Sequence, residues 1–505
     1  MLRIDKRKHQ VRLVAFDTSM TSKYMALSYC WGSQQSHLRA TSETLPRLRE
    51  GVSISSLPRT LEDAVKVAIG LESDFIWIDS VCIVQDDPRD LNEEAGKMGS
   101  VYAQALLTII AKSSSNCNEG FLTKRRHDSI HLASVIVDGQ PTEVRARVVH
   151  DWGHHRGKTH PYGPRRWIDP VDKRAWTLQE MLLSTRYVSF TSGELQWGCQ
   201  TLKDCECGQP LYGGLDKLQE TQELWFAIVE EYSNRLLTVH ADKLTALAGI
   251  ARKFSIDLKG QQYAAGIWVA KQQANNLSAQ GLLWYRGRYW EKGANVNVTS
   301  VPATYTAPTY SWASITGQVS HHRFESSKDY RYPTKVLDAV AEYASPDEFG
   351  RVSGGFIRLV GPLLQAKIRP WDRDNYPYLA PETYIEGINR GFYHGCRLDV
   401  PLEKVTLEDG SYSVRRKRNA LSPSNETERI AEGEFGEETD VCILPIRSQL
   451  TPQISSSSPS EDTFSVYCLV LARSNGHKGY ERIGIYEIYI QQDFVALPVT
   501  EVCIF

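Results

Sequence analysis

The feature that most constrains the fold is an amphipathic helix pattern followed at once by a strand pattern that is apolar on both faces. Residues Thr60–Gly70 (TLEDAVKVAIG) place apolar side chains at the i, i+3, i+4, i+7 and i+8 spacing of one helical face. Residues Asp74–Ile83 (DFIWIDSVCI) are then almost continuously apolar, apart from Asp79 and Ser80 within the run. Such a run is typical of a strand at the centre of a parallel sheet.

The first 125 residues continue this alternation of strands and helices. Tyr24–Cys30 is a short strand pattern that ends at a Trp-Gly turn, Leu91–Ala105 is a second helix pattern, and Leu106–Ala111 is another buried strand. Tyr187–Phe190 supplies a fourth strand further along the chain. The alternation predicts an α/β fold with a doubly wound, mainly parallel sheet flanked by helices.

The character of the sequence changes after this region, which suggests three domains. We expect the sheet domain to span residues 1–210, a helical connector to span 211–282 and a β-rich C-terminal domain to span 283–505. Helix patterns in and beside the connector are Glu223–Leu237, Ala241–Phe254 and Tyr263–Leu277. Strand patterns beyond it are Phe356–Gln365, Asp440–Ile446, Ser465–Ala472 and Ile483–Ile490, with a basic cluster at Arg415–Arg418 and a predicted flexible loop at Ser455–Ser460.

Composition argues against several classes of function. The 505 residues carry 58 Lys and Arg against 60 Asp and Glu, so no overall basic excess indicates a nucleic acid or an anionic membrane as partner. The apolar runs are too short for a membrane span, and the start MLRIDKRKHQ lacks the apolar core of a secretory signal. Ten cysteines are too sparse for a disulfide scaffold, so we expect reduced thiols in a cytoplasmic protein.

Polar residues gather where the predicted parallel strands end. Ser28 and Trp31 lie at the end of the first strand, and Asp79 and Ser80 lie toward the end of the second. Ligands of doubly wound sheets bind beyond the carboxyl ends of the strands, near the point where the strand order reverses. We therefore expect a polar rim there that can hold a nucleotide or a sugar.

Glu180 lies in a helix pattern that follows a crossover, so it can face the same edge of the sheet, and it shares one helical face with Trp176 four residues earlier. Each candidate also has a structural interpretation. Glu180 can be an exposed helix charge, Trp176 a core residue, and Asp79 a helix cap or an acceptor for a loop backbone. The acidic pair Asp86 and Asp87 is typical of turn chemistry.

Other reaction types have weaker support. A cysteine cluster and upstream histidines are possible zinc ligands, namely Cys199, Cys205, Cys207, His150, His154, His155 and His160. Their spacing matches no standard zinc motif, so no metal is expected, although a zinc-supported scaffold stays open as a weaker reading. A nucleophilic Cys30 or Cys82 paired with a distant histidine is also conceivable, but Cys82 lies in a buried-strand pattern. The sequence has no G-x-S-x-G, P-loop or G-x-G-x-x-G motif.

Three blocks of sequence occur in a specific order: Tyr24–Gly32 (YMALSYCWG), Leu57–Ala105 (beginning LPRTLEDAVKVAIG) and Arg174–Phe190 (RAWTLQEMLLSTRYVSF). Together they resemble the fungal heterokaryon incompatibility (HET) domain proteins over roughly residues 20–205. One departure is Cys30, where an aliphatic residue is common in the family. The resemblance implies a role in nonself recognition between fungal strains and in triggering cell death.

The HET domain also resembles TIR domains, which share the doubly wound, flavodoxin-like fold. Catalytic TIR domains cleave the nicotinamide–ribose bond of NAD with a helix glutamate that is commonly preceded by Trp at four residues' distance, and Trp176–Glu180 (WTLQE) is similar to that pattern. The resemblance implies NAD as substrate, no cofactor, and Glu180 as the catalytic residue. The residues that we expect to bind the substrate are Trp176, Asp79, Ser80, Ser28, Trp31 and Arg174.

The alternative function is a non-catalytic signalling adaptor that acts through self-association. A homo-oligomer or an incompatibility partner protein is expected on either reading, because TIR-like sites are often completed by a neighbouring protomer. Many members of the family carry the HET region beside a longer segment. We hypothesise that the segment after residue 215 restrains the N-terminal domain.

Overall fold

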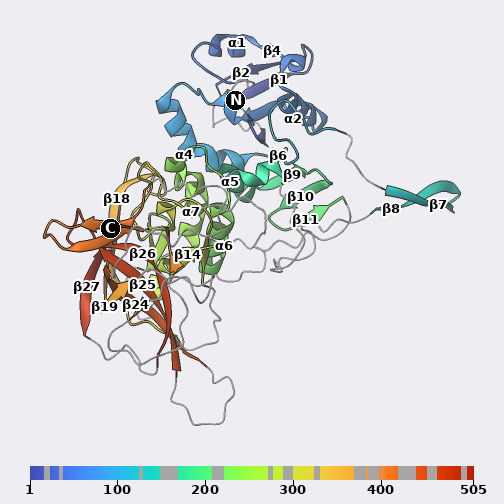
Figure 1. Ribbon diagram of the computed structural model, residues 1–505. Helices are drawn as coiled ribbons and strands as arrows, with labels where there is room; N and C mark the ends of the chain where they lie inside the picture. Colours follow the sequence, from blue (N-terminus) through green and yellow to red (C-terminus); the bar gives the residue numbers. More distant parts are fainter. Residues whose placement is uncertain are drawn as a thin grey trace. The chain divides into compact units, whose positions relative to one another are not determined.

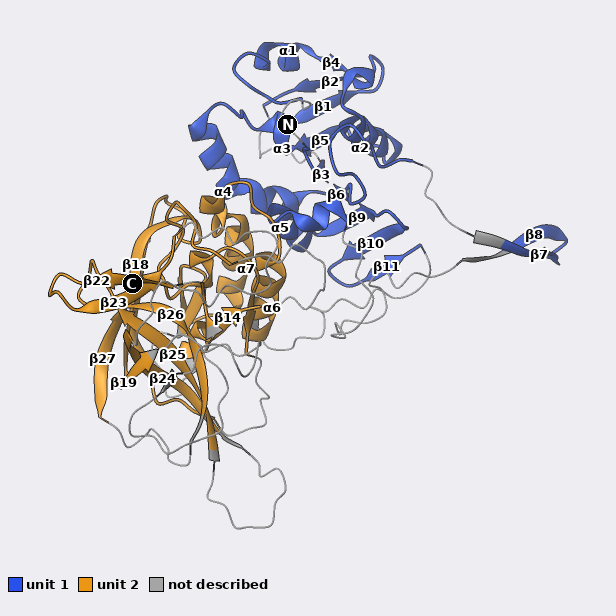
Figure 2. Cartoon of the chain, in the orientation of Figure 1, with its two compact units in different colours: residues 1–218 blue, residues 219–505 orange. Residues whose placement is uncertain are grey.

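A computed structural model describes most of the chain (Figure 1). The described residues are 1–15, 23–32, 38–123, 129–147, 169–206, 221–270, 277–287, 299–322, 330–368, 383–384, 397–400, 402–418, 439–451, 463–490 and 498–505. The chain divides into two compact units, residues 1–218 and residues 219–505 (Figure 2). The finer boundaries at 210 and 282 stay a prediction.

Unit 1 is built on a nine-stranded mixed sheet with the order β11-β10-β9-β6-β3-β5-β1-β2-β4. The strands are β1 (Leu2–Asp5), β2 (Gln10–Leu13), β3 (Met25–Ser28), β4 (Val52–Ser53), β5 (Phe75–Ile78), β6 (Leu107–Ile110), β9 (Arg186–Phe190), β10 (Leu195–Cys199) and β11 (Lys203–Cys205). The helices are α1 (Leu45–Glu50), η2 (Ile54–Ser56), α2 (Arg59–Gly70), α3 (Asp79–Cys82), α4 (Pro88–Gln104), η3 (Pro170–Lys173) and α5 (Trp176–Leu183). A separate hairpin pairs β7 (Ser129–Val137) with β8 (Gln140–Arg147).

The centre of this sheet is parallel, as the sequence predicts. β5, β3, β6 and β9 are neighbours in that order, and each pairs in parallel with the next. In chain order these strands are the second, first, third and fourth of the parallel set, so the order reverses between β3 and β6. The order therefore reverses at the carboxyl ends of β3 and β6, which is the position where ligands of doubly wound sheets bind.

The prediction that the whole sheet is mainly parallel is wrong. Five of its eight strand pairings are antiparallel, and they add β1, β2 and β4 at one edge and β10 and β11 at the other. These edge strands have two to five residues each. The central strands β3, β5 and β6 have only four residues each as well, but nearly all of their residues are buried. β1 and β2 alternate buried and exposed residues, so they lack the continuous apolar run that marks the centre of the sheet. The fold of unit 1 is a mixed α/β fold.

Helices cover both faces of the parallel centre. Because successive side chains of a strand point to opposite faces, β3 sends Met25 and Leu27 to one face and Ala26 to the other. The first face packs against the apolar stripe of α2, which consists of Leu61, Ala64, Val65 and Ala68. The second face packs against Met98 and Tyr102 of α4. Two covered faces are the physical reason for the continuous apolar runs in these strands.

Unit 2 contains a ten-stranded sheet, which confirms a β-rich C-terminal region. Its strands are β16 (Tyr330–Arg331), β17 (Lys335–Tyr343), β18 (Val352–Pro362), β19 (Leu364–Ile368), β20 (Thr383–Tyr384), β21 (Arg397–Leu398), β24 (Thr439–Thr451), β25 (Thr463–Arg473), β26 (Tyr480–Ile490) and β27 (Val499–Ile504). All four predicted strand patterns lie in it, one of them split between β18 and β19 after Pro362. The predicted loop at Ser455–Ser460 lies outside the described residues.

Smaller elements complete unit 2. They are α6 (Thr221–Ser233), η4 (His240–Asp242), η5 (Thr245–Leu247), α7 (Ala248–Asp257), β12 (Gln261–Ala264), β13 (Ile267–Ala270), η6 (Leu277–Leu282), β14 (Trp284–Arg286), η7 (Trp312–Ser314), β15 (Val319–His321), β22 (Leu402–Thr406) and β23 (Tyr412–Arg416). The predicted helix Tyr263–Leu277 is wrong, because β12 and β13 form a hairpin there. Its turn residues Ala265 and Gly266 both have positive φ, which is the geometry of a tight hairpin turn and not of a helix.

Candidate functional site

The candidate site lies at the carboxyl ends of the parallel strands, where the strand order reverses. Ser28 ends β3 and is paired with Ile110 at the end of β6. Asp79 follows directly after β5, the other neighbour of β3. The rim predicted from the sequence is therefore one continuous edge of the sheet, and Ser28 lies at the reversal point.

Glu180 is buried, with only 3% of its surface exposed. It lies in α5, whose residues Thr177, Leu178, Gln179 and Glu180 are all buried, so this part of the helix has no solvent face. α5 packs against α4, and the segment just before it contributes Val171 to a cluster with Cys30 and Ile110. The alternative that Glu180 is an exposed helix charge is therefore wrong.

Asp79 is held by two donors at the start of α3. Its Oδ1 accepts a hydrogen bond from the backbone N–H of Ser80 at 2.7 Å, and its Oδ2 accepts one from Nε1 of Trp31 at 2.8 Å. The Ser80 hydroxyl in turn accepts a hydrogen bond from the Tyr29 hydroxyl at 2.7 Å. Asp79 thus bonds the backbone N–H of the next residue inside α3, whose N-cap is Ile78, so it is neither the helix cap nor the loop-backbone acceptor that the structural interpretation proposed; it belongs to the buried polar edge.

Arg174 supplies the positive charge of the site. Its guanidinium donates a hydrogen bond to the carbonyl oxygen of Tyr29, in the residue that follows Ser28. Burial lowers the pKa of Arg174, but the carboxylates of Glu180 and Asp79 raise it further than burial lowers it. Two buried acids therefore share the charge of one half-buried arginine.

Both acids have raised pKa values. Burial is the main reason why the pKa of Glu180 rises from 4.5 to about 7, and the charge of Asp79 raises it further against the lowering effect of Arg174. Burial likewise raises the pKa of Asp79 from 3.8 to about 6, opposed by Arg174, the Ser80 amide and the Trp31 indole. Buried acids that titrate near neutral pH beside a specific charge partner are characteristic of functional sites.

The Ser28 hydroxyl is a buried polar group without a hydrogen-bond partner among the described residues, and only 1% of the residue is exposed. It lies close enough to Glu180 to lower the pKa of that carboxyl group, as does the Tyr102 hydroxyl. The Ser28 hydroxyl oxygen nevertheless does not meet the distance and angle of a hydrogen bond to any described residue. The Tyr102 hydroxyl, by contrast, donates to the carbonyl oxygen of Leu27 at 3.1 Å. A buried hydroxyl that lacks a partner needs a physical reason, and a bound ligand is one.

The two tryptophans have structural partners. Trp176 is half-buried and packs against the cluster that contains Trp77 and Tyr102, as the core interpretation expects. Trp31 is also partly buried, and its indole N–H is used by Asp79. Their roles in substrate binding stay a prediction.

The acidic loop after β5 is turn chemistry, as its sequence suggests. Asp87 caps α4 by accepting a hydrogen bond from the backbone N–H of Arg89 at 2.9 Å. Asp86 accepts from the backbone N–H of Ser42.

Tyr29 and Tyr102 were missed as site residues, because each lies in a pattern that only indicates core packing. A hydroxyl at such a buried position was the one signal of a polar role.

A metal site finds no support among the described residues, none of which form a group of three or more His, Cys, Asp and Glu side chains able to hold a metal ion. Cys205 is disulfide-bonded, so the prediction that all ten cysteines are reduced is wrong at this position, and this cysteine is not available as a zinc ligand. Cys199 is free. The other members of the proposed cluster, Cys207, His150, His154, His155 and His160, lie outside the described residues.

Comparison with known families identifies this region. Residues 24–180 match the family model described as "Heterokaryon incompatibility protein (HET)". This part of the chain is therefore similar to HET domains, and we refer to it below as the HET domain. The match begins just before β3 and ends at Glu180, so it includes the parallel strands β3, β5 and β6 together with both acids and Arg174. It covers less than a third of the 505 residues and leaves unit 2 unassigned.

Neither the curated proteins nor the solved structures contain a match to this chain. Among the residues that the structure describes, no helix has the length and apolar character needed to cross a membrane.

Proposed function

We propose that the HET domain cleaves the nicotinamide–ribose bond of NAD by a TIR-like mechanism, with Glu180 as its catalytic residue. The observation that carries this proposal is a pair of buried acids, Glu180 and Asp79, that share the half-buried Arg174. Beside them lies the Ser28 hydroxyl, which has no hydrogen-bond partner among the described residues. The group lies at the edge where doubly wound sheets bind nucleotides. The order of β5, β3, β6 and β9, with helices on both faces, supports a doubly wound, flavodoxin-like relationship to TIR domains.

The reaction needs few catalytic groups. The bond between the ribose C1′ and the pyridinium nitrogen breaks, and its electron pair neutralises the positive nicotinamide ring. The ribose becomes oxocarbenium-like, and water then adds to C1′ and releases a proton, which gives ADP-ribose and nicotinamide. Because the leaving group is already cationic, the essential contribution of the protein is negative charge beside the ribose.

Glu180 can provide that charge in its ionised form. At pH values above its raised pKa of about 7 it is mainly a carboxylate, and Arg174 favours this form. The Ser28 hydroxyl is free to donate a hydrogen bond to a ribose hydroxyl or to the attacking water. Asp79, with a pKa of about 6, can accept the released proton.

Access is the main structural requirement of this reaction. Only 3% of Glu180 and 9% of Asp79 are exposed, so neighbouring groups must move before a nucleotide can contact either acid. Arg174 is engaged by both acids, and Arg89 at the start of α4 is an exposed cation that can meet the pyrophosphate. A site that opens only on activation suits a protein that triggers cell death in nonself recognition.

The decisive experiment incubates the purified full-length protein with NAD and measures free nicotinamide and ADP-ribose. We expect release by the wild type and a loss on the order of 100-fold or more in Glu180→Gln. Glu43→Gln is the matched control, because Glu43 is an exposed glutamate of the same unit. Equal release by wild type and a folded Glu180→Gln protein, or no release by a wild type that is active in cell death, contradicts the proposal.

A second candidate function is a non-catalytic adaptor that works by self-association. The observation in its favour is the β7–β8 hairpin, a separate two-stranded sheet with exposed apolar side chains. The exposed fractions are 61% for Leu132, 78% for Ile136 and 50% for Val137. An apolar two-stranded hairpin is marginally stable by itself and gains stability by contact with another surface.

The two functions make opposite predictions for the same pair of variants. If the protein is an adaptor, Ile136→Asp should abolish self-association and cell death while Glu180→Gln leaves both intact. If it is an enzyme, Glu180→Gln should abolish cell death without changing the mass measured by light scattering.

A further inference from the structure

Unit 2 contains a cavity of about 800 Å³ that is lined only by residues of that unit. Its walls come from β18, the β22–β23 hairpin, the turn between β25 and β26 and the segment before η7. The volume is in the upper part of the range of roughly 300–1,000 Å³ that is typical of small-molecule sites. The function proposed for the HET domain does not explain why unit 2 contains this cavity.

The charge of the lining is positive. Four arginines, Arg415, Arg416, Arg418 and Arg473, face two glutamates, Glu342 and Glu481, which gives a net charge of +2 with His477 neutral. Arg415 and Arg473 are exposed and form ion pairs with Glu403 and Asp409, which do not line the cavity. Arg416 and Arg418 form no ion pair within 4 Å with any residue that the structure describes.

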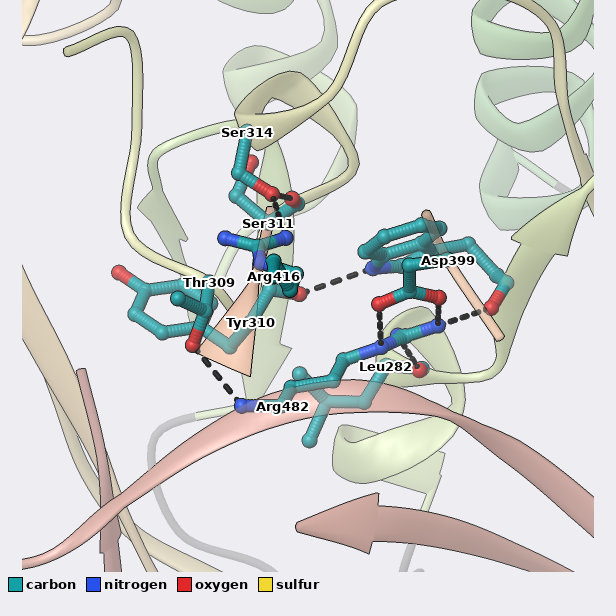
Figure 3. A network of polar contacts seen from close by, with 9 residues as sticks. Leu282, Thr309, Tyr310, Ser311, Ser314, Asp399, Arg416 and Arg482 are labelled. Atoms are coloured by element: carbon teal, nitrogen blue, oxygen red, sulfur yellow. Dashed lines mark hydrogen bonds and ion pairs between the residues drawn. The ribbon is translucent and has the colours of Figure 1, made fainter. Parts of the chain in front are cut away.

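Arg416 is the unusual member of this set, because it is 92% buried, at 8% exposure. Its one hydrogen bond to the described part of the chain goes from Nη1 to the hydroxyl oxygen of Ser314 at 2.8 Å (Figure 3). Burial lowers the pKa of Arg416, and the charges of Asp399 and Glu481 oppose this effect from beyond ion-pair distance. A buried guanidinium without a contacting carboxylate is costly unless an anion pairs with it.

The neighbouring carboxylate, Asp399, is already used by another arginine. Arg482 is fully buried and donates two hydrogen bonds to Asp399, each 3.1 Å long (Figure 3). The Arg482 guanidinium also donates to the carbonyl oxygens of Leu282 and Trp284. Because both oxygens of Asp399 accept from Arg482, Asp399 cannot also neutralise Arg416.

The Arg482–Asp399 pair belongs to a hydrogen-bond network that fixes one wall of the cavity. The backbone N–H of Arg482 donates to the hydroxyl of Thr309 at 3.0 Å, and that hydroxyl donates to the carbonyl oxygen of Phe505. Thr309, Ser314 and Phe505 all line the cavity. The wall that carries Arg416 is therefore held in place without a ligand, which reduces the entropy cost of binding one.

We propose that this cavity binds a phosphorylated small molecule that also carries a ring, such as a nucleotide. Arg416 is the buried phosphate contact, and the exposed Arg418 is a second one at the edge. A planar guanidinium suits phosphate because its N–H donors match two oxygens of the anion at once. The aromatic side chains of Tyr305, Phe356 and Phe505 also line the cavity and provide apolar surface for a ring.

The test is isothermal titration of the full-length protein at low salt with inorganic phosphate, ribose 5-phosphate, AMP and adenosine. We expect saturable binding of AMP, weaker binding of ribose 5-phosphate and phosphate, and no binding of adenosine. Arg416→Met should weaken AMP binding about 10- to 100-fold, the worth of a hydrogen bond to a charged group. Arg358→Met is the matched control, because Arg358 belongs to the same unit but does not line the cavity.

The variants also decide where the ligand binds. AMP can meet the HET domain as well, but only binding in unit 2 is weakened by Arg416→Met and unchanged by Glu180→Gln. If Arg416→Met does not fold, Arg418→Ala replaces it, because Arg418 is exposed. The proposal is overturned if no phosphate compound binds, if adenosine binds as well as AMP, if an acidic peptide binds and phosphates do not, or if the cavity variants bind like the control.

Discussion

Replacing Glu180 with glutamine should stabilise the HET domain at high pH although it removes a proposed catalytic group. The pKa of Glu180 in the folded protein is about 7, against 4.5 for an unperturbed glutamate, mainly because the side chain is buried. The folded state therefore keeps its proton to a higher pH than the unfolded state does. The neutral Glu180 therefore contributes to the stability of the folded state. This contribution is fully present below pH 4.5 and is lost as the pH rises through about 7.

The magnitude follows from the two pKa values. The rise from 4.5 to about 7 corresponds to roughly 3 kcal/mol, at about 1.4 kcal/mol for each tenfold change in proton affinity. Glutamine is neutral at every pH and nearly the same size. The free energy of unfolding of Glu180→Gln should therefore equal that of the wild type near pH 4.5 and exceed it by about 2–3 kcal/mol near pH 8.

The measurement must report on unit 1 alone, because a chain with two compact units need not unfold in one step. Hydrogen exchange followed by mass spectrometry gives the opening free energy of peptides from β3 and β6, and a comparison at equal pH cancels the intrinsic exchange rates. Glu43→Gln should show no pH-dependent difference of this kind. A Glu180→Gln protein that is less stable than wild type at pH 8, or a difference that does not change with pH, would refute the reasoning.

Three further predictions concern the charges and the units. Asp79→Asn should lower the pKa of Glu180, since the charge of Asp79 raises it. In proteins that carry Asp79→Asn, the stabilisation by Glu180→Gln should therefore begin at a lower pH than in proteins that keep Asp79. Arg482→Leu should lower the free energy of unfolding of unit 2 by about 3–5 kcal/mol, because Asp399 is left buried and unpaired, and exchange of β26 peptides measures this loss. If the later segment restrains the HET domain, residues 1–218 expressed alone and shown to be folded by circular dichroism should release nicotinamide faster than the full chain; an equal or slower rate counts against restraint.

The parallel centre of unit 1 could be predicted because each of its strands is covered on both faces. Phe75–Ile78 is apolar throughout for that reason, and its neighbour α2 shows the matching helical stripe. The strands outside this centre could not be predicted in the same way, because β1 and β2 alternate buried and exposed residues and lack a continuous apolar run. The hairpin at Gln261–Ala270 was predicted as a helix, since the turn at Ala265 depends on a positive φ that a non-glycine residue rarely adopts.

The candidate site was only partly predictable. The ends of the strands placed Ser28 and Asp79 together, because the carboxyl ends of parallel strands meet at one edge. Glu180 was expected to be functional, but the helix pattern alone left open whether it is exposed or buried, because α5 has only eight residues and is covered by segments far away in the sequence. The partners of Arg416 could not be predicted either, since the sequence shows Arg415–Arg418 only as a basic cluster.

Three buried charged groups of this protein differ in how far their charges are balanced. Arg482 and Asp399 balance each other, with two hydrogen bonds, and need nothing more than the fold. In the HET domain two acids, Glu180 and Asp79, share the single charge of Arg174, so the buried group has an excess of negative charge when both are ionised. That excess suits a reaction that develops positive charge on a sugar. In unit 2 the excess is positive, because Arg416 is buried without a contacting carboxylate among the described residues, and it suits a phosphate. A fold selected for stability alone has no reason to keep either excess, since an uncompensated buried charge costs several kcal/mol.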